Sequence, residues 1–525
     1  MKSALLTLSA ILLVAGCASP GGSYTEPAVM DVLTNSSVAS DTRPDALPVV
    51  TPAPDIRVDA WWMRFGDETL TRLISKAYAT NRTLTAARAN LRAARAAWEY
   101  QKGVLLPTVD ADGDIMRNRS SENGLSGRRR YTNYNLAATA RWELDLFGRQ
   151  RHLIDAAEAE AEATEADLKA MWVAISSEVA RTYLELRTLQ GRLMVAEDNL
   201  KLQQDNFELQ ADRTAGGLTN ELVKNQAEYD LRSTAATIPS IKAQIVAAEN
   251  MLAILCGVTP GTLPTNLVMH YEKPAENQEA TTEDGEGVRP VGLRPTGIPQ
   301  PEQIPLDMGI SVSALRRRPD VIASERLLKA AVEELAYAEM ERYPNVYITA
   351  ALGVDSIHLG DLLDWDSHFY QFGPGISLPI FRGGRIEANI EMKTEAQRIA
   401  FANYEETVLT ALGDIRTAYA AYTQEMERLM HLRRGVQAAQ DAYEIASNKY
   451  NAGLGDFFDV LDAQRKLFTL DEARVLCEGN IATSQVALYQ SLCGGWEGEA
   501  APEVAEQLFG VTEAAEPLLM PLSQE

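Results

Sequence analysis

The sequence predicts a mainly α-helical protein with a membrane β-barrel portion, and three observations support that fold class. The first is a duplication: residues 84–256 correspond to residues about 236 positions later, so that Tyr183 matches Tyr419 and Gly217 matches Gly453. The others are two pairs of alternating strands and two long helical segments with coiled-coil spacing. A two-copy repeat of this size differs from a short-period solenoid. It predicts a pseudo-symmetric architecture that uses a unit of strand, strand, long helix and long helix twice.

The first residues have the pattern of a secretory signal. Lys2 precedes an apolar run over residues 4–14, which is too short to span a bilayer. The run ends in Val14-Ala15-Gly16-Cys17, which resembles the bacterial lipoprotein box and implies cleavage before Cys17 and lipidation of that cysteine, for example with palmitate. The residue after Cys17 is Ala18 rather than an Asp. By resemblance to the sorting pattern of such lipoproteins, this favours the outer membrane. The alternative is an ordinary signal with an incidental cysteine.

Composition divides the chain into six segments. Ser, Thr, Ala and Pro dominate the stretch before the first copy, and Pro, Gly and acidic residues dominate the stretch between the copies. We therefore expect a signal peptide (1–16), a lipidated cysteine and extended tether (17–55), a first repeat (56–257), a linker (258–306), a second repeat (307–496) and an acidic C-terminal tail (497–525).

Two segments in each copy show the period-2 alternation of β-strands. In the first copy the apolar sets are Val109, Ala111, Gly113 and Ile115, and then Tyr134, Leu136, Ala138, Ala140, Trp142, Leu144 and Leu146. In the second they are Val346, Ile348, Ala350 and Leu352, and then Tyr370, Phe372, Ile376, Leu378 and Ile380. Such strands suit a soluble sheet or a membrane barrel. The predicted outer-membrane localisation favours the barrel, with apolar residues facing the lipid.

Four strands leave two open edges, which hydrocarbon does not tolerate. The sheet must therefore close with strands from other chains. Two chains would supply eight strands and three would supply twelve, and both numbers occur in bacterial barrels. The residue pattern leaves that choice open.

The long helices are predicted by a seam whose members are spaced four and three residues apart, as in a coiled coil. Its members are Leu168, Trp172, Ile175, Val179, Thr182, Leu186, Leu189, Leu193, Ala196 and Leu200. The seam recurs 236 positions later, where Glu425 is its one charged member. A helix from about Arg149 to Asp212 would be about 95 Å long at a rise of 1.5 Å per residue, which suits a gap between two membranes.

Composition excludes several classes of function. A net charge of −24 argues against nucleic acid as a partner, because phosphate contacts need clustered Lys and Arg. The five histidines, at 152, 270, 358, 368 and 431, have no metal-site spacing, and no HExxH, GxSxG or P-loop motif occurs. Cys256, Cys477 and Cys493 suggest buried free thiols. The sequence therefore predicts no enzyme, no cofactor and no metal site.

Several short motifs resemble the TolC-like outer-membrane factors, in particular the lipoprotein branch (OprM/NodT-like) that serves resistance-nodulation-division (RND) efflux systems. The most specific is the segment Leu315-Arg316-Arg317-Arg318-Pro319-Asp320-Val321 before the second copy. Trp61-Trp62 with Phe65 and Leu70 looks like the opening helix of that family, and Leu144–Gly148 and Leu378–Gly384 resemble its strand exits.

This resemblance implies a trimer, with a twelve-stranded β-barrel in the outer membrane continued by a twelve-helix α-helical tunnel in the periplasm. It also implies a passive conduit that exports small molecules or drugs, with a periplasmic adaptor (membrane fusion) protein and an inner-membrane RND transporter as partners. Two alternatives remain in the conduit class, a type I protein-secretion channel and a metal-efflux channel. An alternative of another class is a non-conducting coiled-coil lipoprotein that acts as an envelope scaffold.

The resemblance places a periplasmic gate at the helix turns Ala215–Asn220 and Asn451–Asp456. Asp459 and Asp462 match the acidic positions of the family's closed entrance, and Tyr450 is placed to hydrogen-bond across it. In a trimer each Asp would form a ring of three carboxylates that controls opening and cation preference. Two positions depart from the family pattern: Val223 stands where many members carry an acidic residue, and Gly455 where some carry an Arg that latches the closed state.

Overall fold

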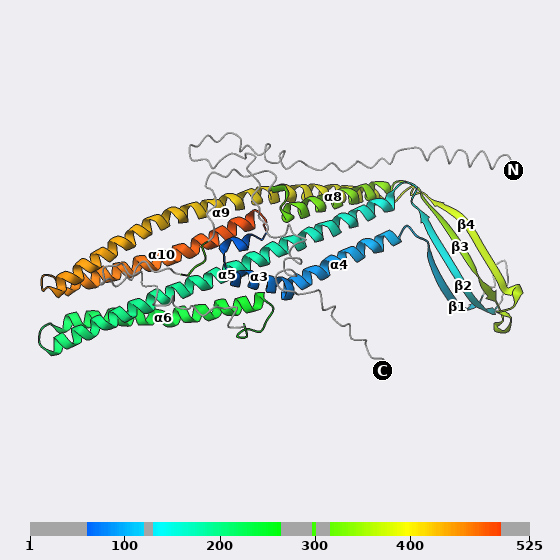
Figure 1. Cartoon of the computed structure of the whole chain (residues 1–525). Helices are drawn as coiled ribbons and strands as arrows, with labels where there is room; N and C mark the ends of the chain where they lie inside the picture. Colours follow the sequence, from blue (N-terminus) through cyan, green and yellow to red (C-terminus); the bar gives the residue numbers. More distant parts are fainter. Residues whose placement is uncertain (1–59, 120–129, 264–296, 301–314, 495–525) are drawn as a thin grey trace, which may run out of the picture. The chain divides into compact units, whose positions relative to one another are not determined.

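The protein was analysed as a computed structural model, in which residues 60–119, 130–263, 297–300 and 315–494 are described. Cys17, the tether and the acidic tail lie outside these residues. The described elements are η2 (Trp61–Phe65), α3 (Glu68–Thr80), α4 (Arg82–Gly103), β1 (Thr108–Arg119), β2 (Arg130–Leu144), α5 (Arg149–Ala215), α6 (Glu221–Leu255), α8 (Pro319–Met340), β3 (Asn345–Ser356), η4 (Leu359–Asp361), η5 (Trp365–Ser367), β4 (His368–Ser377), α9 (Arg385–Asn451) and α10 (Phe457–Ser491) (Figure 1).

The expected order of two strands and two long helices is confirmed in both copies, and a helix, α4 or α8, precedes each strand pair. The paired elements even match in length, since α5 and α9 each have 67 residues and α6 and α10 each have 35. The opening segment differs from the expectation of one helix. Gly66 adopts a left-handed φ of 62° and separates η2 from α3, which begins with Asp67 accepting hydrogen bonds from two backbone N–H groups.

The four strands form one antiparallel sheet in the order β1-β2-β3-β4, so β2 and β3 join the two copies (Figure 1). The register pairs Leu136 with Val354 and Ala137 with Gly353. Gly353 is required there because a Cβ would lie 2.5 Å from the carbonyl oxygen of Leu136. Two strand ends were wrong in the sequence interpretation. β2 stops at Leu144, before Leu146, and β4 stops at Ser377, before Pro379, which cannot donate to a ladder.

The chain divides into two compact units, and each combines segments of both copies. The first contains Arg88–Asp167 and Asp320–Thr407, and the second contains the described parts of Leu33–Ala87, Leu168–Pro319 and Val408–Glu525. The repeat is therefore a unit of sequence but not a separate compact body.

In the first unit the helices are neighbours in the same order as the strands that they adjoin. α4 contacts α5 through Arg95 and Glu165, whose side chains are 3.0 Å apart. α8 contacts α9 through Glu334 and Lys393, 2.8 Å apart. Contacts between α5 and α8 join the two pairs. The helices thus lie in the order α4-α5-α8-α9. This order matches β1-β2-β3-β4 because each helix adjoins one end of its strand.

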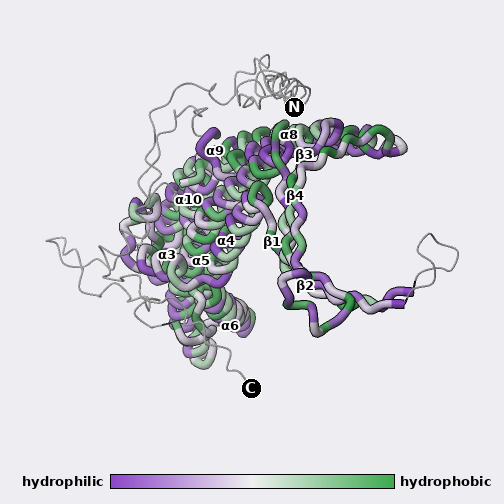
Figure 2. Tube along the Cα trace, turned by 90° about the vertical axis from the view of Figure 1, so that its right-hand side faces the viewer, coloured by the Kyte–Doolittle hydropathy of each residue, from purple (hydrophilic) through white to green (hydrophobic). Residues whose placement is uncertain are grey.

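The predicted seams are buried on the long helices. Val179 and Leu186 of α5, and Val408 and Ile415 of α9, are almost completely covered, whereas Glu425 is only half-buried. Hydrophilic and hydrophobic residues are interleaved along the helices (Figure 2), as expected when one stripe packs and the rest meets water. The coiled-coil prediction therefore located the packing face correctly.

The main core of the second unit forms around the opening segment. Trp61 is fully buried, stacks on Tyr489 of α10 with ring centroids 5.4 Å apart, and makes edge contacts with Trp62 and Phe65. Tyr78 of α3 contacts Trp172 of α5 at 4.8 Å. η2 and α3 therefore fill the space beside the long helices, which a single layer of helices would leave open to water.

Replacement of Trp61 by Ala is expected to destabilise the second unit by about 3–5 kcal/mol, because a large aromatic side chain leaves a cavity. Thermal unfolding of the purified protein in detergent, followed by circular dichroism, should show a lower midpoint. Trp365→Ala is the matched control, since Trp365 is 84% exposed in the β3–β4 connection. Equal midpoints for the two variants would contradict a core role for Trp61.

Candidate functional site

The two helix turns of the second unit are the same structure built twice. Gly217 and Gly453 both have a φ of 72°, a left-handed conformation that glycine adopts without strain. In each turn a backbone N–H reaches back to the last turn of the long helix, from Leu218 to Arg213 and from Leu454 to Lys449, both at 2.8 Å. Asn220 caps α6 and Asp456 caps α10 with their side-chain oxygens. The turns are therefore hydrogen-bonded, capped ends of two helical hairpins.

A small apolar cluster lies beside these turns. It contains Phe457, Val460 and Leu461 of α10 and Ala227 of α6, all buried. Phe457 points into this cluster, whereas Phe458 is half exposed. The two adjacent aromatic residues thus have different environments, and Phe457 packs between helices.

Tyr450 is held by three contacts. Its hydroxyl donates to Oε1 of Gln210 at 3.2 Å and accepts from Nε2 of the same amide at 3.0 Å. Its ring lies 5.1 Å from the ring of Phe457, and the guanidinium of Arg213 lies 4.9 Å above it. Gln210 is fully buried, so its amide depends on this hydroxyl. Tyr450 therefore ties the last turn of α9 to α5 near the two hairpin ends.

The two aspartates of the sequence hypothesis have different surroundings. Asp459 is exposed in the first turn of α10, where the helix dipole favours a negative charge. It lines an open hollow of about 590 Å³ together with Tyr450, Val223 and Gly455. Asp462 is not among the residues that line this hollow, and its carboxylate lies 2.6 Å from Lys466 one turn along α10. The structure thus brings Asp459 and Tyr450 together but directs Asp462 to a lysine.

One ion pair between the hairpins was not evident from the sequence. Arg465 of α10 binds the carboxylate of Asp230 on α6 through Nε, at 2.8 and 3.0 Å, and Asp230 is buried. This contact raises the pKa of Arg465. From the sequence, both residues look like solvent-exposed charges on helix surfaces. Their pairing depends on the alignment of two helices, and the two residues are 235 positions apart in the chain.

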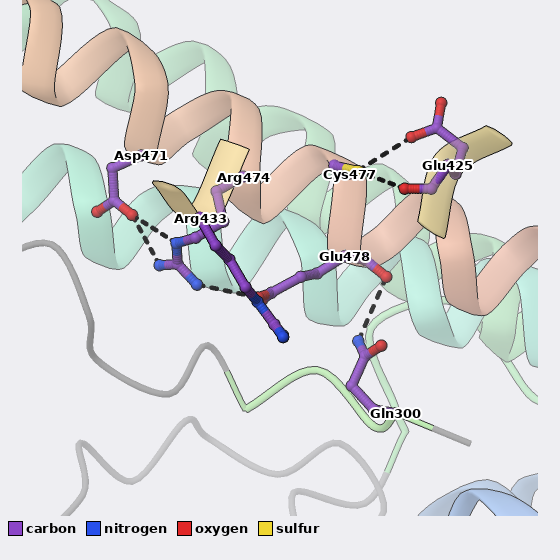
Figure 3. A network of polar contacts seen from close by, with 7 residues as sticks. All are labelled: Gln300, Glu425, Arg433, Asp471, Arg474, Cys477 and Glu478. Carbon is purple, nitrogen blue, oxygen red and sulfur yellow. Dashed lines mark hydrogen bonds and ion pairs between the residues drawn. The ribbon is translucent and has the colours of Figure 1, made fainter. Parts of the chain in front are cut away.

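Further from the turns, a buried polar network joins α9 and α10 (Figure 3). Arg474 binds Asp471 at 2.7 Å and Glu478 at 3.1 Å, and all three side chains are buried. Burial raises the pKa of Asp471, and Arg474 opposes that shift. The counterparts of Asp471 and Arg474 in the first copy are Ala235 and Ile238, so this network belongs to the second copy alone.

Glu425, the charged member of the second seam, accepts hydrogen bonds from the thiol of Cys477, which lies beside this network. Sγ of Cys477 donates to Oε2 of Glu425 at 3.1 Å and to its carbonyl oxygen at 3.3 Å (Figure 3). Burial and then the adjacent carboxylate raise the pKa of Cys477 to about 12. The thiol therefore stays protonated at neutral pH and satisfies the half-buried acid. Cys256 and Cys493 are also free and buried, as expected.

One ion pair is repeated with its charges exchanged. Glu197 of α5 lies 3.2 Å from Lys242 of α6, and Arg433 of α9 lies 3.5 Å from Glu478 of α10. Each residue of the second pair stands 236 positions after its counterpart in the first. The two helical hairpins therefore have the same alignment, which the duplication predicted, while their charges have diverged.

An antiparallel sheet with exposed apolar side chains, carried on long paired helices, defines a class of envelope channel proteins, and comparison with known proteins agrees with this description. The family described as "Outer membrane efflux protein" matches residues 73–258 and 310–494. The chain belongs to this family, and the resemblance to outer-membrane factors is confirmed.

Three known proteins illustrate the relationship. The chain is 29% identical over 440 residues to the toluene efflux pump outer membrane protein TtgC of Pseudomonas putida, covering 83% of this chain and 85% of TtgC. It is 27% identical over 497 residues to the probable outer membrane lipoprotein SilC of Salmonella typhimurium, covering 94% and 99%. The solved outer-membrane channel OprN superposes with a TM-score of 0.77 at 28% identity, covering 92% of this chain and 100% of OprN.

Removal of the Tyr450 hydroxyl is expected to loosen the α9–α10 turn. In Tyr450→Phe the buried amide of Gln210 loses its partner, which costs about 1–3 kcal/mol. Hydrogen exchange followed by mass spectrometry should show faster exchange in residues 445–460 of the variant. Tyr100→Phe is the control, because Tyr100 is 76% exposed on α4, away from the turns. Unchanged exchange in both variants would show that Tyr450 does not hold the turn.

Proposed function

We propose that three copies of this chain form a passive conduit through the outer membrane, as the channel component of a tripartite efflux system. The observation that supports this assembly most directly is the sheet, in which β1 and β4 are edges of the described strands. Its apolar side chains are exposed in one chain, among them Val109, Ile115, Leu136, Leu352, Tyr370 and Phe372. Lipid would cover these side chains, and strands of neighbouring chains would pair with both edges.

Three chains fit a conduit better than two. Two four-stranded sheets give eight strands, and the interior of an eight-stranded barrel is filled by side chains. Three give twelve, which leaves an aqueous lumen. The face opposite the apolar one carries Asp110, Asp112, Asp114 and Arg141, which suits water. Four neighbouring helices per chain in the first unit likewise give a twelve-helix tunnel, which would extend through the periplasm.

Helix α6 supports contact between chains. By length and composition it could cross a membrane, and Leu222, Tyr229, Val246 and Ile254 are exposed. Its ion pairs with Arg465 of α10 and Glu197 of α5, however, place it within the helical part. We therefore assign its exposed apolar residues to a neighbouring chain of the trimer.

The turns form the closed entrance of the tunnel in this proposal. Asp459 and Asp462 would form rings of three carboxylates, the second with Lys466 beside it, and Tyr450 of α9 packs on Phe457 at the start of the helix that carries them. The first copy has Val223 and Gln226 at the corresponding positions. At these matched positions the acidic residues therefore lie on α10 alone, so opening would move the α9–α10 hairpin relative to the α5–α6 hairpin.

The conduit has no catalytic role in this scheme, and its driving force comes from partners. A periplasmic adaptor and an inner-membrane RND transporter would load substrates at the entrance. The name of TtgC supports small apolar molecules as cargo. A type I protein-secretion or metal-efflux channel is the alternative in the same class, and cross-linking followed by identification of the bound adaptor and pump distinguishes them.

Asp459→Ala combined with Asp462→Ala is expected to raise single-channel conductance in planar bilayers and to lower cation preference, because the carboxylate rings are lost. Asp441→Ala with Glu444→Ala is the matched control, since it removes two exposed charges spaced i, i+3 on α9. Conductance and selectivity that match the unaltered protein would remove the gate hypothesis. Absence of any conductance in the unaltered protein would instead favour the non-conducting scaffold.

Lipidation is tested separately at Cys17. Cells that express the unaltered chain and are fed labelled palmitate should incorporate the label, and Cys17→Ser should not. Because a closed barrel spans the membrane without the anchor, the variant should still fractionate with the outer membrane. Equal labelling of the two proteins would show that Cys17 is not the modified residue.

A further inference from the structure

Three side chains that can coordinate a metal ion meet between α5 and α8 in the first unit. They are His152, Asp155 and Glu333, and one ligand atom from each lies within 4.8 Å of the others. Nδ1 of His152 is 2.7 Å from Oε2 of Glu333. The sequence had no signal for this arrangement, because the histidine and the glutamate are 181 residues apart.

The backbone holds these ligands in place. His152 and Asp155 are spaced i, i+3 near the start of α5, so their side chains share one face. α8 is fixed against α5 further along by Glu162, which lies 3.5 Å from Arg326 and 3.7 Å from Lys329. The spacing of the two helices therefore does not depend on the cluster itself.

The cluster is shielded on one side and open on the other. The side chains of His152 and Glu333 are 16% and 13% exposed, whereas Asp155 is exposed. Asp145 adds a third nearby carboxylate, and Lys329 and Arg151 are the nearby cations. With a neutral imidazole, three carboxylates face two cations, which leaves one excess negative charge that a bound cation would neutralise.

We propose that His152, Asp155 and Glu333 form a binding site for a divalent transition-metal ion of the Zn²⁺ type, which joins α5 to α8. Imidazole nitrogen and carboxylate oxygen are both zinc ligands, three protein ligands are the number of an open zinc site, and the open side leaves a fourth position for water. Mg²⁺ and Ca²⁺ prefer oxygen ligands alone and are disfavoured by the imidazole. The hydrogen bond between His152 and Glu333 opens when the ion enters between them.

The site occurs once per chain, because the duplication does not reproduce it. The counterparts of His152 and Asp155 are Ala388 and Glu391, and Ala96 stands at the position that corresponds to Glu333. The ion would link the helix that follows β2 to the helix that precedes β3. These strands are the ones that join the two copies.

The test is titration calorimetry of the purified full-length protein in detergent, without a histidine tag, using ZnCl₂ as the probe. We expect one Zn²⁺ per chain, retained in a large excess of MgCl₂. His152→Ala should weaken binding by more than the roughly 10–100-fold that loss of an outer partner of a ligand causes. Zinc binding that is absent from the unaltered protein, or that is displaced by Mg²⁺, would overturn the proposal.

Two further variants separate metal binding from folding and from adventitious zinc. Asp155→Asn keeps the hydrogen bond between His152 and Glu333, so zinc-free thermal unfolding should match the unaltered protein while zinc affinity falls. His431→Ala is the control, because His431 is exposed on α9, and its affinity should be unchanged. Equal affinity of Asp155→Asn and the unaltered protein, or loss of binding in His431→Ala, would assign the zinc to other groups.

Discussion

The outer edges of β1 and β4 impose the constraint on which the other features depend. Along each edge a row of backbone N–H and C=O groups has no partner strand among the described residues of one chain. In hydrocarbon each unpaired group costs several kcal/mol, so a sheet with an apolar face is stable there only when it closes. Within the chain, the β2–β3 ladder and its close approach at Gly353 fix how the two copies meet. In the proposed conduit, closure between chains would use a whole number of these four-stranded sheets.

The same constraint extends from the sheet into the helices. The neighbouring helices of the first unit, α4, α5, α8 and α9, lie in the order of the strands that they adjoin. Ion pairs between adjacent helices, such as Arg95–Glu165 and Lys393–Glu334, show this order. A barrel and a tunnel built from these units must therefore contain equal numbers of strands and helices. A metal ion between His152 and Glu333 would strengthen the junction of the two copies, where one α5 meets one α8.

Duplication supplied matched backbones, and divergence of side chains made the copies unequal. The glycine turns are identical, and the pair Glu197–Lys242 recurs as Arg433–Glu478 with its charges exchanged. The second copy also buries Arg474 with Asp471 and Glu478, where the first copy has Ile238, Ala235 and Lys242. Breaking such a buried pair is costly, and the same network contacts α9 through Arg433, which pairs with Glu478, and through Glu425, which accepts from Cys477. In the proposed conduit, the acidic positions Asp459 and Asp462 would therefore lie on the α9–α10 hairpin, opposite Val223 and Gln226 of the other hairpin.

The sequence by itself determined the duplication, the four strands, the long helices and the turns, because hydrophobic periodicity and glycine positions are local properties. It also placed Asp459 and Tyr450 near one turn. Only the tertiary structure decided which charges meet: Asp230 with Arg465, Asp462 with Lys466, and His152 with Glu333. The physical reason is that side-chain partners depend on the rotation and alignment of helices hundreds of residues apart, which no local pattern specifies.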